Sequence, residues 1–266
     1  MEIFERIRRR DDELHQILVE FFPWTMPILD LAAAPRKTLQ VFLLSMAKID
    51  FLKSGIFDLC ESDNPYAAKV LYRSLVEHHA QFMYVWHRYL KAHNDEAAEE
   101  YLTFYAWDEY LKYGKDLKEL GARTGCSSTE TPYEVLCQVI PAVAAHSPKE
   151  IRMKARQFAF SEIVRFLREQ WKSNKSSGGS IPDVVLKLPL LYGELCSFVH
   201  GGPDAEHELM SMKDEAERME ESVRLAQLSW QMSGSIKLLL LLVLYQFDKK
   251  FGPPFNKVNS ILKSGI

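Results

Sequence analysis

The sequence contains little that favours β structure. Glycine and proline each occur only 12 times in 266 residues, and no segment alternates apolar and polar residues as a half-buried strand does. Apolar residues instead recur three and four positions apart, which is the spacing of amphipathic helices. The sequence therefore predicts an all-α fold, a helical bundle with long central helices and short connecting helices.

Cysteine is also scarce, and its spacing argues against a bound metal. The cysteines form no CxxC pair, have no histidine at zinc-ligand spacing and are Cys60, Cys126, Cys137 and Cys196. The Glu-x-x-His pairs of di-iron bundles are missing, as are glycine-rich phosphate loops and the HExxH, GxSxG and kinase motifs. We expect reduced core thiols, no metal and no cofactor.

The chain lacks both a strong net charge and a long apolar run. The formal charge of -3 gives no overall reason to bind nucleic acid or an anionic membrane. The most apolar stretch, 236–247, is interrupted by Lys237 and is shorter than the roughly 20 residues of a membrane-spanning helix. The charged N-terminus does not have the pattern of a secretory signal. A cytoplasmic protein without membrane contact is expected.

Breakers and capping residues predict where the helices lie in a single domain of residues 1–266. Asn64 followed by Pro65 marks a helix start, because asparagine caps an N-terminus and proline fits the first turn. Pro23 is expected to end the first helix and Gly121 the fourth. The predicted helices cover residues 2–22, 36–60, 65–93, 96–121, 132–145, 148–171, 183–200 and 214–249. A flexible loop is expected near 172–182, and the tail 252–266 is expected to pack loosely or to serve for contact.

The third predicted helix is apolar nearly all the way round, which is typical of a buried helix. Its polar positions Arg73, Glu77 and Gln81 are four residues apart and form one narrow stripe, which His78 and His79 flank. Burying an arginine and a glutamate costs several kcal/mol unless they pair and are hydrogen-bonded. The stripe is therefore either an internal ion pair that fixes helix register or the lining of a cavity. The histidines are either packed core or part of a site.

Polar side chains also recur at a fixed interval near the end of the helix predicted for 183–200. Tyr192, Cys196 and His200 are four residues apart, and two glycines and a proline then stop the helix. The negative end of the helix dipole favours a protonated His200. Such a histidine is a C-terminal cap, a proton donor or a phosphate contact. Together with the Arg73 stripe it would form a site between two helices of the bundle.

These segments carry a resemblance to known families. The run from Leu71 to Glu77, followed by the run from Ser197 to Gly202, resembles a family of uncharacterised bacterial helical proteins with an arginine-glutamate helix and a later histidine-glycine motif. The third helix is also similar to the HEPN superfamily of helical bundles, in which a histidine follows an arginine by a few residues; both His78 and His79 fit. That superfamily includes metal-independent ribonucleases of toxin-antitoxin and antiviral defence systems, which usually pair two protomers. The resemblance implies RNA as substrate and a homo-oligomer or a partner protein.

RNA cleavage is therefore the leading functional hypothesis, although the residues leave open whether the protein is an enzyme. A histidine among His78, His79 and His200 would move the proton, Arg73 would neutralise phosphate charge, and Glu77 would orient a histidine or act as the base. The expected nucleic-acid surface is the basic segment 149–175, with its interleaved aromatic residues. Its main members are Arg152, Lys154, Arg156, Arg165, Arg168 and Lys172. The alternative for this segment is an ordinary helix with a solvated basic face.

Two other functions fit the same stripe. One is a non-catalytic adaptor or sensor that binds a partner protein and uses the Arg73–Glu77 pair only to fix its core. The other is a bundle whose polar cavity binds a small anionic ligand. A solvent-connected cleft at Arg73 would favour a site, whereas a sealed and fully paired Arg73–Glu77 would favour the adaptor.

Overall fold

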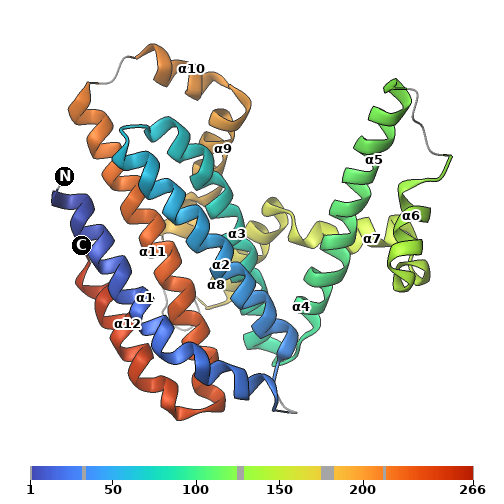
Figure 1. Ribbon diagram of the computed structural model, residues 1–266, viewed down its shortest axis with the longest axis horizontal. Helices are drawn as coiled ribbons and strands as arrows, with labels where there is room; N and C mark the ends of the chain where they lie inside the picture. The colour runs from blue at the N-terminus through green and yellow to red at the C-terminus, as the bar shows by residue number, and fades with distance from the viewer. Residues whose placement is uncertain (1, 32–33, 125–128, 175–182, 212–213, 266) are drawn as a thin grey trace.

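In the computed structural model the chain folds into helices alone (Figure 1). The structure describes residues 2–31, 34–124, 129–174, 183–211 and 214–265, and no β-strand occurs within them. This confirms the predicted all-α helical bundle. The α-helices are α1 (Glu2–Leu29), α2 (Arg36–Glu61), α3 (Pro65–Ala92), α4 (Glu96–Glu100), α5 (Ala106–Thr124), α6 (Pro132–Val139), α7 (Pro148–Ala155), α8 (Phe160–Asn174), α9 (Asp183–His200), α10 (Pro203–Met210), α11 (Glu215–Phe247) and α12 (Gly252–Ser264). The other helical turns are a π-helical turn (Tyr101–Tyr105) and 3-10 turns (Pro141–Ala145, Arg156–Phe158 and Lys249–Phe251).

A helical hairpin of α2 and α3 forms the centre of the bundle, and α11 packs across both. Asn64 caps α3, since its side chain accepts a hydrogen bond from the Ala67 backbone N at 3.1 Å. Pro65 occupies the first turn, and α3 ends at Ala92, followed by the capping residue His93 in a left-handed conformation with φ of 51°. The predicted bounds of α2 and α3 are therefore confirmed to within one residue.

The first helix is longer than predicted. α1 continues through Pro23 and Pro27 to Leu29, whereas the sequence predicts its end before Pro23. An internal proline costs a helix about 3 kcal/mol. Phe21 and Thr25, on either side of Pro23, are each only 1% exposed, so burial of this face against the bundle outweighs that cost.

The C-terminal tail belongs to the core, contrary to the prediction of loose packing. Residues 252–264 form α12, which lies against α1 and α11. Val258 is fully buried and Ile261 is 9% exposed. Gly234 of α11 has no side chain where Leu262 packs, so the two helices approach closely. The tail has few apolar residues, but helix formation gathers them on one face.

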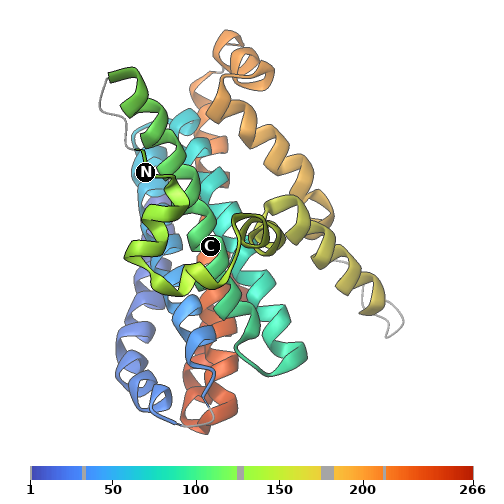
Figure 2. The same ribbon diagram turned by 90° about the vertical axis from the view of Figure 1, so that its right-hand side faces the viewer.

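The segment after α3 builds an arm with its own small core. The fourth predicted helix, 96–121, consists of α4, the π-helical turn and α5, and α5 passes Gly121 to end at Thr124. Side chains buried in the arm form a cluster separate from the bundle core: Phe104, Trp107, Leu111, Leu136, Val143 and Ile151. Figure 1 shows the arm standing away from the bundle. Figure 2, seen from the side of the arm, shows α8, α9 and α10 along one edge of the bundle.

The chain between α8 and α11 differs in detail from the prediction. α8 runs to Asn174, so the predicted loop near 172–182 begins in a helix, and residues 175–182 lie outside the described residues. α9 ends at His200 as its glycines predict, with Gly201 in a left-handed conformation at φ of 63°. The chain then forms α10, a helix that the sequence analysis did not anticipate. Buried Lys69 of α3 holds it through an ion pair with Glu208.

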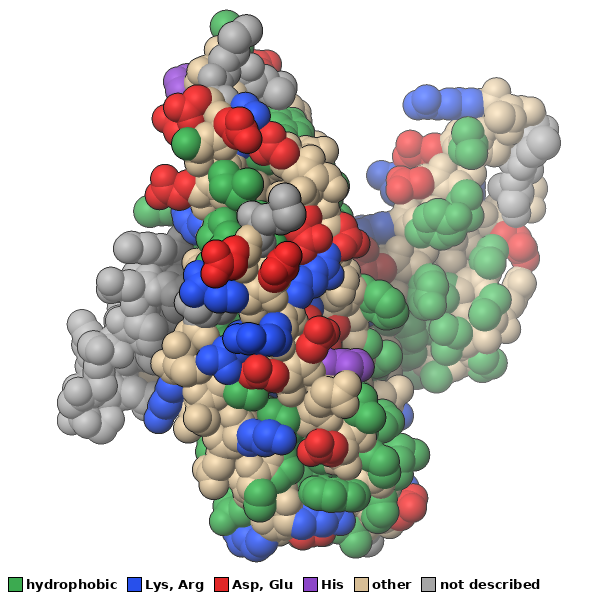
Figure 3. Space-filling model, turned by 60° about the vertical axis from the view of Figure 1, so that its left-hand side comes forward, with side chains coloured by type: hydrophobic (Ala, Val, Ile, Leu, Met, Phe, Trp, Pro, Cys, Tyr) green, Lys and Arg blue, Asp and Glu red, His purple; other side chains and the backbone are tan. Residues whose placement is uncertain are grey.

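Helix α11 is long and apolar enough to cross a membrane by length and composition. However, 56% of its most apolar window is buried inside the bundle, as in a core helix of a soluble protein. Lys237, which interrupts the apolar run, is 1% exposed and lies 2.5 Å from the Asp50 carboxylate of α2. On the face that Figure 3 presents, Lys, Arg, Asp and Glu side chains are interspersed over the middle and upper part of the bundle, and hydrophobic side chains gather towards the lower end.

Candidate functional site

The predicted polar stripe of α3 faces α9. The Arg73 guanidinium donates to the Tyr192 hydroxyl at 2.7 Å and to the Cys196 sulfur at 3.4 Å. Arg73 Nη1 also lies 3.5 Å from Glu77 Oε2, and these side chains keep 21% and 32% of their surface exposed, so the pair is not sealed. Burial opposes the charge of Arg73, but the hydrogen bond to Cys196 and the nearby Tyr192 and Glu77 outweigh it and raise its pKa. The spacing of Tyr192 and Cys196 thus correctly located the second helix that contacts Arg73.

A cavity of about 840 Å³ opens beside this pair. We call it the central cavity; α3, the π-helical turn, α5, α8 and α9 surround it where the arm joins the bundle. Its charged lining residues are Glu77, Glu109, Lys112, Arg165, Arg168 and Glu169. Its other large lining residues are Gln81, Tyr105, Phe158, Phe160, Val164 and Tyr192. This size and this mixture of aromatic and polar groups are typical of sites for small organic ligands.

The charged groups of the central cavity differ in how firmly they are held. Lys112 lies 2.8 Å from both Asp108 and Glu109, and these partners raise its pKa against the opposing effect of burial. Arg165 pairs with Glu162 but keeps 69% of its side chain exposed, so this surface pair contributes little energy. The Glu77 carboxylate has the long 3.5 Å ion pair with Arg73 described above. Arg165 and Glu77 are therefore well placed to change partners when a ligand binds.

Two tyrosines of the π-helical turn are fixed on Gln81. The Tyr101 hydroxyl donates to Gln81 Oε1, and Gln81 Nε2 donates to the Tyr105 hydroxyl, each at 3.2 Å. The two rings stack with their centroids 5.1 Å apart. Burial raises the pKa of both hydroxyls, so both are neutral at physiological pH. π-helical turns are rare and frequently occur at functional sites, and this one orients the Tyr105 ring in the cavity wall.

Tyr192 has a different role from Tyr105. Phe160 stacks on its ring at a centroid distance of 3.8 Å, and the Arg73 guanidinium lies over the ring, 5.0 Å from the centroid. Because the protein itself packs against this ring, Tyr192 serves to orient Arg73 and does not offer a platform for a ligand. Tyr105 is the better candidate for stacking.

The two histidines of α3 lie away from Arg73. Residues five and six positions apart differ by about 140° and 240° around a helix axis, so neither histidine shares the face of Arg73. His79 contacts the Ser235 hydroxyl of α11 at 3.0 Å, and burial lowers its pKa to about 4. His78 contacts Gln81 at 3.2 Å, and burial also lowers its pKa. The arginine-histidine spacing that resembles HEPN proteins does not bring the two side chains together within this chain.

His200 does not join the Arg73 cluster either. It is exposed at the end of α9, and this last turn lies beside the beginning of α3. There the Tyr66 hydroxyl donates to the Phe198 carbonyl O at 3.4 Å, and Lys69 Nζ lies 4.4 Å from the Phe198 ring centroid. The expected grouping of Arg73, Glu77 and His200 is therefore not assembled in the structure.

The members of the predicted nucleic-acid surface have different surroundings in the structure. Lys154 of α7 lies 4.3 Å from the Phe104 ring centroid in the arm, whereas Arg165 and Arg168 of α8 line the central cavity. The remaining members are Arg152 and Arg156, which are exposed, and Lys172, whose side chain lies outside the described residues. Arg156 and Arg165 both pair with Glu162, so these two cations lie near each other at the start of α8.

Phe158 and Phe160, two of the aromatic residues interleaved with these cations, are part of the core. Phe158 and Phe160 are 1% and 9% exposed, and Phe158 packs edge-on against Tyr84 and Tyr101. They cannot stack with bases on an outer surface without leaving the core. The sequence pattern of alternating cations and aromatics reflects an amphipathic helix here.

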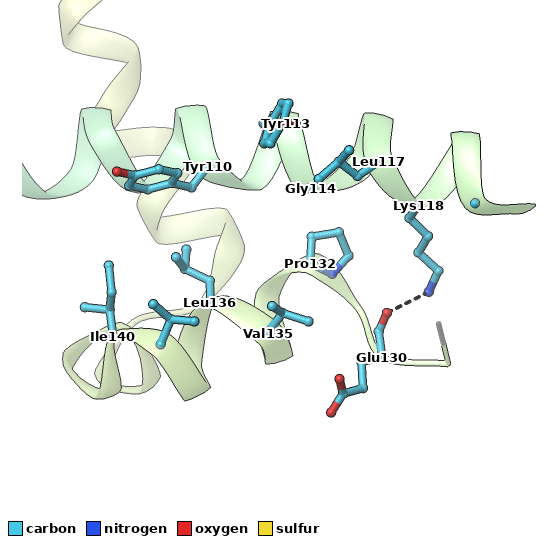
Figure 4. A pocket seen from close by; sticks show the side chains of 12 residues that line it. Tyr110, Tyr113, Gly114, Leu117, Lys118, Glu130, Pro132, Val135, Leu136 and Ile140 are labelled. Atoms are coloured by element: carbon cyan, nitrogen blue, oxygen red, sulfur yellow. Dashed lines mark hydrogen bonds between the residues drawn. The ribbon is translucent and has the colours of Figure 1, made fainter. Parts of the chain in front are cut away.

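The arm carries a second, more apolar hollow between α5 and α6 (Figure 4). Its volume is about 490 Å³, and Tyr110, Leu117 and Val135 are among its lining residues. Lys118 donates to the Glu130 carbonyl O at 3.2 Å at one end of it. No residue predicted for a site lines this hollow, so the central cavity is the better candidate.

The candidate metal ligands and the cysteines are scattered through the described residues. The described residues contain no group of three or more histidine, cysteine, aspartate or glutamate side chains that could hold a metal ion. Cys60 is a buried free thiol, and burial raises its pKa to about 12. Cys137 and Cys196 are also free but only partly buried, whereas Cys126 lies outside the described residues.

Comparison with known protein families finds a match that includes the whole central cavity. A model described as a family of unknown function, DUF5677, matches residues 41–218. No curated protein and no solved structure matches the chain. All residues that line the central cavity lie within the matched range, whereas α1, α12 and most of α11 lie outside it.

Proposed function

The chain belongs to DUF5677, a family of unknown function, and we propose that it binds a small ligand with a planar ring and an anionic group in the central cavity. The observation that carries the proposal is the composition of this cavity. Two arginines of α8 and the Tyr105 ring line one volume of about 840 Å³, which the partly exposed Glu77 also reaches. Nucleoside monophosphates combine both groups and are suitable probes.

Arg165 and Arg168 form the end of the cavity suited to the anion. A guanidinium binds a phosphate through charge-assisted hydrogen bonds, which are stronger than those between neutral groups. The ion pair between Arg165 and Glu162 is largely exposed and therefore weak, so Arg165 loses little by turning to a phosphate. Binding by side chains also explains how a chain without a glycine-rich phosphate loop would hold such a ligand.

Tyr105 forms the end suited to the ring. Tyr101 covers one face of Tyr105, and Phe158 lies 5.3 Å from Tyr101 but 6.0 Å from Tyr105. Because Phe158 is nearer to Tyr101, it lies beside the stacked pair and not on the outer face of Tyr105. A planar ligand would extend the stack on that outer face, and base-aromatic stacking contributes about 1–3 kcal/mol.

Arg165 and Arg156 provide a matched pair of variants. Both pair with Glu162 and are 69% and 77% exposed, but only Arg165 lines the central cavity. We expect Arg165→Gln to weaken GMP binding about tenfold, because a hydrogen bond to a charged group contributes about 1.5–3 kcal/mol. Arg156→Gln should leave the dissociation constant unchanged. Isothermal titration calorimetry measures both; equal effects of the two variants, or no binding of GMP, AMP, UMP or CMP, would contradict the proposal.

RNA cleavage is a second candidate, favoured by the presence of a carboxylate base and phosphate-binding cations in one cavity. In this reaction Glu77 would take the proton of the 2′-hydroxyl, that oxygen would attack phosphorus, and the displaced oxygen would leave with a proton from water. Arg165 would neutralise the phosphate charge. His79, with a pKa of about 4, is neutral at physiological pH and faces Ser235.

Labelled cellular RNA incubated with the protein in EDTA tests this second candidate. We expect cleavage by the wild type, loss of cleavage by Glu77→Gln and full activity of His79→Gln, provided that the helical circular dichroism is unchanged. Intact RNA with the wild type would leave ligand binding alone as the function. Loss of cleavage in His79→Gln but not in Glu77→Gln would instead favour an HEPN-like arrangement.

A further inference from the structure

Of the two acidic lining residues on α3 and α5, Glu77 and Glu109, Glu77 has more acceptor capacity left for a ligand; the third, Glu169, lies on α8 with Arg165 and Arg168. Glu109 is held by Lys112 at 2.8 Å. Glu77 has the 3.5 Å ion pair with Arg73, which is too long for a strong charge-assisted hydrogen bond. Its side chain remains 32% exposed. An ionised carboxylate is an acceptor only, so the cavity presents two oxygens to hydrogen-bond donors of a ligand.

Glu77 lies close to the ring platform. It is one turn before Gln81 on the same face of α3, and residues with this spacing have Cβ atoms about 5–6 Å apart. Gln81 in turn holds the Tyr105 hydroxyl at 3.2 Å. Burial is the main cause of the raised pKa of Tyr105, and the negative charges of Glu109 and Glu77 add to it, which reflects that both carboxylates lie near this hydroxyl. A ring stacked on Tyr105 therefore presents an edge towards the Glu77 carboxylate.

From this juxtaposition we infer that the central cavity selects guanine nucleotides, with Glu77 reading the base. This inference rests on the proposed function. Guanine carries two adjacent donors, N1–H and the exocyclic amino group, which match the two oxygens of one carboxylate. Adenine presents the N1 acceptor at the same place, where it would face the negative charge of Glu77. Hypoxanthine keeps N1–H but lacks the amino group, so IMP should bind with intermediate affinity.

The charged residues that line the cavity also indicate which side binds the phosphate and which side binds the base. The α8 side of the lining carries Arg165 and Arg168 against Glu169, a net positive charge that attracts the phosphate, whereas the charged lining residue of α3 is Glu77, which repels it. A nucleotide is therefore oriented with its phosphate towards α8 and its base towards α3. Tyr192, between Phe160 and Arg73, keeps Arg73 beside Glu77.

Dissociation constants of GMP, IMP and AMP for the wild type, Glu77→Gln and Glu109→Gln test the inference. Two matched hydrogen bonds discriminate between bases by about tenfold or more. We expect the wild type to bind GMP about tenfold more tightly than AMP, with IMP between them. Glu77→Gln should bring the ratio of GMP to AMP affinity close to one, whereas Glu109→Gln, whose native carboxylate is engaged by Lys112, should change this ratio by a smaller factor.

The outcomes separate this inference from the proposed function. Equal affinity of the wild type for GMP and AMP would overturn guanine selection while leaving ligand binding in the cavity intact. A preference for GMP that Glu77→Gln retains would overturn the role of Glu77. Failure of all three nucleotides to bind would overturn the proposed function and the inference with it. Thermal unfolding and circular dichroism of each variant establish that it is folded.

Discussion

Replacing Asp50 by asparagine is expected to lower the free energy of unfolding by about 3–5 kcal/mol, the cost of breaking a buried ion pair from one side. Asp50 Oδ1 lies 2.5 Å from Lys237 Nζ and 3.2 Å from Lys53 Nζ, and it accepts a hydrogen bond from the Ser233 hydroxyl at 2.6 Å. Lys237 and Lys53 are 1% and 4% exposed. Removing the carboxylate leaves the Lys237 charge uncompensated inside the bundle. Urea unfolding at neutral pH measures the loss.

Lys237→Met is the control for this prediction, and we expect it to cost about 1 kcal/mol or less. A buried ion pair can be replaced by apolar side chains with little loss, and Asp50 keeps Lys53 and Ser233 as partners in this variant. Burial lowers the pKa of Lys237, which reflects how costly its charge is in the bundle. Equal losses in the two variants would show that the pair contributes through packing and not through charge.

The same cluster determines how stability depends on acid. Burial opposes ionisation of Asp50, but Lys237 and Lys53 outweigh it and hold its pKa below the ordinary value. A group whose pKa is lower in the folded state contributes stability above its unfolded pKa of about 3.9. This contribution is lost as the pH falls through the lower folded value. The difference between wild type and Asp50→Asn should therefore be constant at neutral pH and shrink only in strong acid.

The second large effect concerns His79. When the pH is lowered from 7 to 4.5, we expect this residue to reduce the free energy of unfolding by about 2 kcal/mol. Burial lowers its pKa from 6.5 to about 4. Below pH 6.5 the unfolded chain binds a proton at this residue that the folded chain does not, so stability falls as the pH is lowered and stops falling near pH 4. One pKa unit corresponds to about 1.4 kcal/mol.

His79→Gln isolates this contribution, because glutamine still has a hydrogen-bonding group for the Ser235 hydroxyl but does not titrate. Chemical unfolding of both proteins at pH 7 and pH 4.5 gives the four free energies needed. We expect the wild type to lose about 2 kcal/mol more than the variant on acidification. Parallel losses would mean that His79 is protonated in the folded protein, which would restore it as a candidate acid for RNA cleavage.

The long helices were predictable because local signals and the fold agree. Asn64 with Pro65 at the start of α3, and the glycines after His200, are explicit end signals, and the structure follows both. The errors at Pro23 and in the tail 252–266 share one cause. There the helix is stabilised by contacts with distant segments, and no local pattern in the sequence reports such contacts.

The candidate site was predictable in part. The four-residue spacings of Arg73 with Glu77 and of Tyr192 with Cys196 indicated two helix faces that meet in the structure. A helical projection would also have shown that His78 lies on a different face from Arg73. Tyr105 gave no recognisable signal, because its orientation depends on a π-helical turn that short sequence patterns do not identify.

The basic segment shows a different limit of sequence reasoning. Alternating cations and aromatics between residues 149 and 175 suggested one surface for nucleic acid. In the structure a 3-10 turn at Arg156–Phe158 separates α7 from α8. Arg165 and Arg168 then face the central cavity, whereas Lys154 packs in the arm. The composition of the segment indicated that it could bind anions. Which of its cations lie close enough to bind the same anion depends on the backbone turn, and composition alone does not give the turn.

The most direct test of the central claim is a crystal structure of the protein with GMP. We expect the nucleotide in the central cavity, with its phosphate beside Arg165 and Arg168 and its base stacked on the outer face of Tyr105. GMP bound in the hollow between α5 and α6, or density for it nowhere in the central cavity, would contradict the account.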